Sequence, residues 1–108
     1  MVISAIGDRI PRLAAASAAA APYCVPGVEP AYAFSFKALH DALGPEMGDL
    51  LECEHGNPDN GDTLQQTTRG LSFYRKSTNT PTFTNGWEHW ALTSRGLVYW
   101  TGAAVDPP

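Results

Sequence analysis

Short runs of β-branched, aromatic and aliphatic residues, separated by turn-forming residues, fill the second half of the chain. Residues 63–68, 71–76, 87–93 and 97–101 all have this composition. Such runs, bounded by glycine, asparagine or proline, are typical of β-strands. The pattern predicts four strands that pair as two β-hairpins.

The two predicted hairpins share one sequence motif, repeated at an offset of 26 residues. The motif is threonine, a small hydroxyl residue, Arg-Gly-Leu, one variable position and two aromatic residues. Because a glycine with positive φ closes hairpins of this kind, we expect that conformation at Gly70 and Gly96. The two copies are Thr67-Thr68-Arg69-Gly70-Leu71-Ser72-Phe73-Tyr74 and Thr93-Ser94-Arg95-Gly96-Leu97-Val98-Tyr99-Trp100.

The repeat also predicts the core, because successive side chains of a strand point to opposite faces of a sheet. Equivalent residues of the two hairpins are expected to point the same way. The predicted inward residues are Leu71, Phe73, Leu97 and Tyr99. The predicted opposite face carries Ser72, Tyr74, Val98 and Trp100.

Residues 77–86, between the hairpins, are predicted to be a connection. Pro81 cannot donate a backbone hydrogen bond, so any strand here is expected at an edge of the sheet. Phe83 is the only large apolar side chain in the segment, and Asn85-Gly86 predicts a turn.

One helix is predicted before the hairpins. Its apolar stripe consists of Tyr32, Phe36, Leu39 and Leu43. Ser35 is the expected N-terminal cap, and Gly44-Pro45 ends the helix because proline cannot continue it. Residues 47–54 are expected to form a short strand, and residues 55–62 are turn-forming.

Isolated hairpins are marginally stable, so we expect both to share one face that the helix covers. The predicted fold class is therefore α+β: a small antiparallel sheet of tandem β-hairpins, about four or five strands, with one packed helix. Residues 31–108 form this single domain. Residues 1–30 form an Ala/Pro-rich N-terminal arm.

The arm has a second interpretation as a degenerate export signal. Arg9 and Arg12 precede a run of small and apolar residues at 13–21, and Pro22 follows. Positive charge, a short apolar run and small residues are typical of secretory signals. An alanine-rich linker or a short helix fits the same residues.

Cys24 and Cys53 are the only cysteines. In an exported protein an even pair indicates a disulfide, which here closes a loop of about 30 residues. The alternatives are two free thiols or a metal site, because Cys53-Glu54-His55 places three ligand-type side chains together. Zinc sites use cysteine or histidine pairs at fixed spacings that this sequence lacks, so the disulfide is favoured.

Composition and charge exclude several classes of partner. The net charge is −4 and the densest basic stretch is Arg75-Lys76. Nucleic-acid binding draws most of its affinity from basic surfaces, so no nucleic-acid partner is predicted. No apolar run is long enough for a membrane span.

Residues 43–100 contain a series of short motifs. They are Leu43-Gly44, Asn57-Pro-Asp-Asn-Gly-Asp-Thr-Leu-Gln-Gln-Thr-Thr68, Gly70-Leu71, Tyr74-Arg75-Lys76, Thr80-Pro-Thr-Phe-Thr-Asn-Gly86, His89-Trp90-Ala91-Leu92 and Gly96-Leu97-Val98-Tyr99-Trp100. Together they resemble an uncharacterised module found near the ends of bacterial exported proteins, some of which carry peptidase or cell-wall-related domains. The resemblance covers a little over half of the chain and implies an extracytoplasmic location, secreted or at the cell surface.

The same region is distantly similar to the LGFP repeat of bacterial envelope proteins. Gly61-x-x-x-Gln65 and the Gly96–Trp100 stretch correspond to conserved parts of that repeat. The Phe-Pro pair that follows Leu-Gly in the repeat is replaced here by Pro45-Glu46. The similarity implies a location at the cell envelope more than it implies a function.

Polar and aromatic residues of the hairpins are candidates for glycan binding, since flat rings stack on sugars and amides bind hydroxyl groups. The alternative is that these rings complete a small core or lie at its rim. The candidate ligand-binding residues are Tyr74, Arg75, Trp87, Trp100 and Gln65.

No recognisable catalytic motif, cofactor site or metal site is predicted. The spacing of Glu52, Glu54, Asp62 and Glu88 does not single out a carboxylate pair for glycoside hydrolysis. His89 is predicted to be packed or hydrogen-bonded. The turn at 57–62 lacks the alternating acidic ligands of a calcium loop.

The sequence therefore predicts a non-catalytic extracytoplasmic binding module. Its expected partner is a cell-wall or glycan component or another protein. The alternative is a structural subunit of an extracellular assembly, an oligomer whose N-terminal arm lies on a neighbour. A small hydrolase or a metal-binding domain is the third interpretation.

Overall fold

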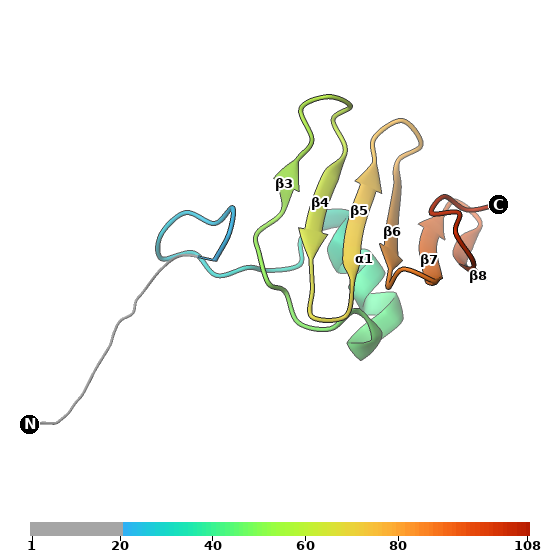
Figure 1. Cartoon of the computed structure of the whole chain (residues 1–108), viewed down its shortest axis with the longest axis horizontal. Helices are drawn as coiled ribbons and strands as arrows, with labels where there is room; N and C mark the ends of the chain where they lie inside the picture. Colours follow the sequence, from blue (N-terminus) through green and yellow to red (C-terminus); the bar gives the residue numbers. More distant parts are fainter. Residues whose placement is uncertain (1–20) are drawn as a thin grey trace, which may run out of the picture.

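The computed structural model describes residues 21–108 (Figure 1). Residues 1–20, and with them most of the predicted export signal and arm, lie outside the described part. Within residues 21–108, no helix combines the length and apolarity needed to cross a membrane.

One helix packs on one antiparallel sheet, which confirms the predicted α+β class. Six strands lie side by side in chain order, from β3 at one edge to β8 at the other (Figure 1). The elements are α1 (Phe34–Leu43), a 3-10 helix (Gly44–Met47), β3 (His55–Gly56), β4 (Thr63–Gln66), β5 (Leu71–Arg75), β6 (Thr80–Thr84), β7 (Glu88–Thr93) and β8 (Gly96–Thr101).

Both predicted hairpins are present, as β4–β5 and β7–β8. The first threonine of the motif organises each turn. The hydroxyl oxygens of Thr67 and Thr93 accept hydrogen bonds at 3.1 Å from the backbone N–H groups of Arg69 and Arg95. The repeated motif is therefore a repeated turn structure.

Strand β6 corrects the prediction that residues 77–86 form a connection with any strand at an edge. It lies in the middle of the sheet, between β5 and β7, and all five of its residues are buried. Pro81 is tolerated because it pairs only with Tyr74 on β5, whereas the pairing with β7 begins at Thr82. The N–H that proline lacks is therefore not needed for pairing with β7, because at this position β6 pairs only with β5.

Two local predictions before the sheet were wrong. The residue that precedes α1 is Ala33, so Ser35 lies inside the helix, and no side chain of the described residues caps it. Residues 47–54 form no strand beyond a single bridge from Leu50 to Thr67. The Glu52 carboxylate accepts the Gln66 N–H at 2.8 Å. A side-chain oxygen therefore takes the place of the backbone carbonyl that a neighbouring strand would supply.

The end of α1 follows the prediction. Gly44 has a φ of 65°, and its N–H donates to the carbonyl oxygen of His40. Pro45 then opens the 3-10 helix. Met47 at its end joins Leu39 and Phe83 in the buried core.

The strand register defines two faces of the sheet. The helix face, beneath α1, carries a row of Gln65, Ser72, Phe83, Trp90 and Tyr99. The tail face, on the other side, carries a row of Leu64, Phe73, Thr82, Ala91 and Val98.

This register corrects the predicted core, because equivalent residues of the hairpins lie on opposite faces. Phe73 is buried on the tail face, whereas its equivalent, Tyr99, is on the helix face and 52% exposed. Leu97 is 44% exposed, although it was predicted to point inward. For the same reason Tyr74 and Trp100 do not share a face.

The C-terminal residues 102–108 cover the tail face. The Trp100 ring N–H donates to the carbonyl oxygen of Ala104 at 2.7 Å. Further along, Asp106 binds Arg75 on β5 at 2.8 Å. The sheet is thus covered on one side by α1 and on the other by this tail.

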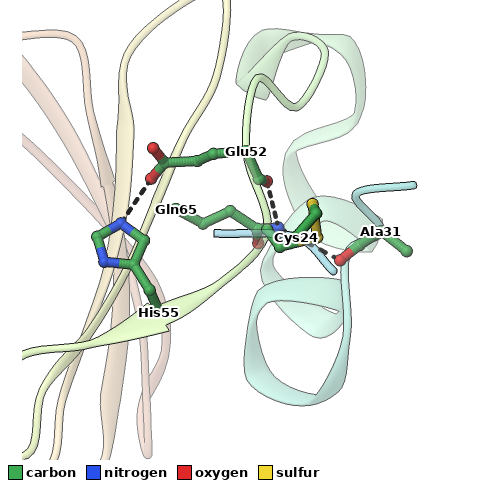
Figure 2. Close-up of a disulfide and its surroundings, with 6 residues drawn as sticks. Cys24, Ala31, Glu52, His55 and Gln65 are labelled. Carbon is green, nitrogen blue, oxygen red and sulfur yellow. Dashed lines mark hydrogen bonds and ion pairs between the residues drawn. A yellow bond between two sulfur atoms is a disulfide. The ribbon is translucent and has the colours of Figure 1, made fainter. Parts of the chain in front are cut away.

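The predicted disulfide between Cys24 and Cys53 is present and joins residues 29 positions apart (Figure 2). Both sulfurs are therefore used, and the alternative metal site at Cys53-Glu54-His55 is wrong. The Cys53 N–H donates to the carbonyl oxygen of Pro22 at 3.0 Å. Tyr23 stacks on His55 with ring centroids 3.5 Å apart, so this end of the described chain is attached to the sheet.

The two matched glycines have different roles. Gly96 has the predicted positive φ, 101°, and a Cβ there would meet open space. Gly70 has no positive φ, which corrects the prediction; instead, a Cβ there would lie 2.1 Å from the carbonyl oxygen of Thr84. Strand β6 crowds the first turn, whereas no strand of residues 21–108 lies beyond β8.

Alanine at the two glycines should therefore give unequal losses of stability. Gly70→Ala forces β5 and β6 apart and is expected to cost about 3 kcal/mol of the free energy of unfolding. Gly96→Ala costs about 1 kcal/mol through backbone strain alone. Urea unfolding of both variants tests the order, and equal losses would contradict it.

Loss of the disulfide should lower stability by about 3.5 kcal/mol, because the unfolded chain gains the entropy of an open loop of about 30 residues. The measurement is urea unfolding of the wild type with and without reductant. The double variant Cys24→Ser, Cys53→Ser is the control: it should match the reduced wild type and be insensitive to reductant.

Candidate functional site

The five residues predicted to bind ligand do not lie on one surface. Gln65 is fully buried. Its side-chain amide donates to the carbonyl oxygens of Glu52 at 3.1 Å and Ala31 at 3.4 Å (Figure 2). This amide holds the segment before α1 against the sheet and is not accessible to a ligand.

Arg75 is held by two carboxylates on the tail face. It donates to Asp62 at 3.0 Å and to both oxygens of Asp106 at 2.8 and 3.4 Å. Its guanidinium lies 5.0 Å from the centre of the Phe73 ring. The second Asp62 oxygen accepts the Lys76 N–H at 3.0 Å. Arg75 therefore fastens the C-terminal tail to the sheet.

The two candidate tryptophans also lie apart from Tyr74. Trp100 is partly buried on the tail face and stacks on His89, with centroids 5.3 Å apart. Trp87 is exposed in the turn between β6 and β7. Neither ring lines a cleft with the other candidate residues.

Tyr74 is the one candidate that lines a cleft on the helix face. The cleft has a volume of about 570 Å³ and lies where the N-terminus of α1 meets β4 and β5. The Tyr74 hydroxyl binds the side chain of Asn79, which also lines it. The lining residues are Phe34, Ser35, Glu54, Gly61, Thr63, Tyr74, Lys76 and Asn79.

A second cleft of about 470 Å³ adjoins the first, because Ser35 and Asn79 line both. It continues around the start of α1 to the β7–β8 turn, where Thr93, Ser94 and Arg95 lie. We call the two clefts together the helix groove. Hydroxyl, amide and charged side chains dominate its lining.

Phe34 is the most exposed aromatic side chain of the described residues, at 91%. It also has a φ of 53°, in the left-handed region that is unfavourable for residues other than glycine. The fold thus accepts both backbone strain and loss of apolar burial at Phe34. Tyr23 shares these features, with a φ of 64° and 66% exposure, but its ring stacks on His55. Strained residues of this kind concentrate at ligand-binding sites.

Sequence reasoning missed Phe34, although a signal was present. The residue falls off the apolar stripe of the helix that includes Phe36 and Leu39, so its ring could be predicted to point outward. The backbone strain was not predictable from a single sequence.

The groove offers binding chemistry and lacks a pair of acids. Glu54 is the one carboxylate among its lining residues, whereas glycoside hydrolysis uses two. Lys76 and Arg95 supply positive charge. The arrangement can stack a sugar ring on Phe34 or Tyr74 and bind hydroxyl and carboxylate groups around it.

Outside the groove, two histidines have carboxylate or carbonyl partners. His89 is buried, as predicted, with one ring nitrogen 2.7 Å from the Gly102 carbonyl oxygen and the other 2.7 Å from the Thr84 hydroxyl. The carbonyl can only accept, so the ring nitrogen beside Gly102 carries the proton of that hydrogen bond. Both nitrogens are occupied within the fold.

His55 lies 2.8 Å from the buried carboxylate of Glu52 (Figure 2). The Tyr23 ring covers one side of its imidazole. Because the same carboxylate oxygen accepts the Gln66 N–H, this pair fixes the segment before β3. Within residues 21–108, no three histidine, cysteine, aspartate or glutamate side chains gather as a metal site would require.

Asp62 makes the tail attachment sensitive to acid. Hydrogen bonds from the Lys76 N–H and from Arg75 hold the pKa of the Asp62 carboxyl below its usual 3.8. A lowered pKa in the folded state means that the stabilisation is complete well above pH 4 and is lost as pH falls through the folded-state pKa.

We expect the urea midpoint of the wild type to fall between pH 6 and pH 2, and Asp62→Asn to reduce this fall. If the midpoints of the wild type and Asp62→Asn fall equally, Asp62 does not have this role.

Comparison with protein families, with curated proteins and with solved structures finds no match to this chain. The helix groove is therefore assigned from its own geometry.

Proposed function

We propose that the protein is a non-catalytic extracytoplasmic module that binds a glycan of the cell envelope in the helix groove. The observation that carries this proposal is Phe34, an exposed ring held in a strained conformation. It lines the first cleft beside Ser35, one of the two residues that line both clefts.

The chemistry of the lining supports a sugar ligand. Carbohydrates present apolar ring faces surrounded by hydroxyl groups, and aromatic rings with nearby amide and hydroxyl side chains complement both features. Phe34 and Tyr74 supply the rings, and Asn79, Thr63 and Ser94 supply the polar groups. Each cleft also has the volume of a typical small-ligand site, roughly 300–1,000 Å³.

The positive charge of the groove favours an acidic glycan. Lys76 and Arg95 lie on a protein whose net charge is −4, and one carboxylate, Glu54, lies among the lining residues. Peptidoglycan and acidic wall polysaccharides carry carboxylates and meet this requirement.

The location is supported by the Cys24–Cys53 disulfide, because disulfides persist in oxidising compartments such as the periplasm or the cell exterior. The resemblance of residues 43–100 to a module of bacterial exported proteins implies the same location.

Substitutions at Phe34 separate binding from folding. Phe34→Ala should weaken binding to purified peptidoglycan or to soluble wall fragments at least tenfold, because it removes the stacking ring without removing buried area. Phe34→Gly should weaken binding equally while raising stability by about 1 kcal/mol, since glycine adopts positive φ without strain. Titration calorimetry and urea unfolding measure the two effects.

Trp87→Ala is the matched control, because Trp87 is also an exposed aromatic but lies outside the groove. It should bind as the wild type does. The proposal fails if Trp87→Ala loses binding while Phe34→Ala retains it, or if the wild type binds no wall polysaccharide.

A further inference from the structure

Strand β8 ends the sheet, and no strand of the described residues pairs with its outer side (Figure 1). The Gly102 N–H donates to the carbonyl oxygen of Trp87 at 2.9 Å, which extends the β7–β8 register by one pair. Because backbone groups of a strand alternate in direction, the residues in phase with Gly102 face β7. The N–H and C=O groups of Leu97, Tyr99 and Thr101 therefore point away from the sheet.

This edge has none of the features that usually prevent strands from pairing. The six residues of β8 include no charged residue and no proline. The opposite edge, β3, is only two residues long. Natural sheets protect their edges with charges, proline, bulges or very short strands, and an unprotected edge is a template for another strand.

The C-terminal tail does not cover the edge. Its contacts run over the tail face, from Ala104 against Trp100 to Asp106 against Arg75. Val105 lies between them, in a cavity that Leu71 and Phe73 also line. Residues 102–108 thus turn back across the sheet and leave the outer side of β8 open.

The side chains at the edge also favour a strand as partner. Leu97 and Tyr99 are both exposed on the helix face. The Tyr99 ring lies 5.3 Å from Trp90, which in turn lies 5.8 Å from the buried Phe83. A row of aromatic rings thus runs out from the core and stops at Tyr99, where a further strand would continue it.

We propose that β8 pairs antiparallel with β8 of a second copy of this protein, joining two sheets edge to edge. With a twofold axis at Tyr99, each Leu97 lies opposite Thr101 of the second copy, and the two Tyr99 residues lie opposite each other. The outward backbone groups can then form about six hydrogen bonds between copies. This association goes beyond glycan binding and does not depend on it.

A second copy fits this edge better than an unrelated peptide because the strand is complementary to itself. It is uncharged, so bringing two copies together creates no like-charge contact along the strand. The nearest acid on β7 is Glu88, whose carboxylate accepts a hydrogen bond from the Tyr99 hydroxyl at 2.8 Å. The Glu88 backbones of the two copies would lie roughly 20 Å apart, given strand spacings near 4.8 Å and 3.3 Å per residue. That backbone separation exceeds the screening length at physiological salt.

Sedimentation of the full oxidised chain over a range of concentrations tests the proposal. The wild type should show a dimer that grows with concentration. Thr101→Pro should weaken association at least tenfold, because it removes an outward N–H that β7 does not use. Leu97→Lys should do the same by placing a charge at the interface, and Ala42→Lys, the same charge on an exposed helix position, should associate as the wild type does.

Amide hydrogen exchange of the wild type gives a test that needs no variant to fold. The amides of Leu97, Tyr99 and Thr101 should exchange more slowly at high than at low protein concentration. A wild type that remains monomeric at millimolar concentration overturns the proposal, as does association that Leu97→Lys and Ala42→Lys change equally. A wild type that stays monomeric and instead binds extended peptides at β8 also overturns it.

Discussion

The arrangement of the whole sheet depends on one strand, β6, that lies between the two hairpins. Because neighbouring strands are antiparallel, a single intervening strand makes the second hairpin begin at the opposite end of the sheet from the first. The second hairpin is therefore turned end for end relative to the first, but the order of its two strands across the sheet is the same. One rotation does both: a half-turn about an axis that lies in the plane of the sheet and is perpendicular to the strands. That rotation also exchanges the faces of the hairpin. Phe73 and Tyr99, equivalent in sequence, must therefore lie on opposite sides.

This inversion explains why the small domain needs two covers. The first hairpin places Phe73 on the tail face, and the second places Trp90 and Tyr99 on the helix face. Helix α1 packs over β5 and β6, so Phe83 is buried and Tyr99, two strands further out, is not. On the other side the C-terminal tail covers the sheet and is fastened through Arg75. The exposed aromatic residues of β8 thus follow from topology and from the limited reach of one helix.

Sequence reasoning succeeded where the determining contacts are local and failed where they come from distant strands. The two turns, the helix end at Gly44 and the disulfide depend on residues close in sequence or on cysteine pairing, and all were predicted. Gly70 was misread because its constraint is the carbonyl oxygen of Thr84, on a strand that was predicted to be a connection. Gln65 was assigned to a ligand for the same reason: its polar side chain binds main-chain carbonyls that reach it only in the folded state. In the site, Tyr74 was predicted and Phe34 was not.

Two features of the fold oppose its own stability, and they lie on different surfaces. Phe34 combines a strained backbone with an exposed ring, although glycine at this position would relieve the strain. Strand β8 leaves backbone groups and apolar side chains open, although one lysine would protect the edge. In a sequence that specifies only a stable monomer, the conformational preference of each residue agrees with the overall fold. Such a sequence would have avoided both features. No described segment pairs with the outer edge of β8, and the Phe34 ring is 91% exposed, so both features are available to a partner. For Phe34 we propose a ligand in the helix groove, and for β8 another strand.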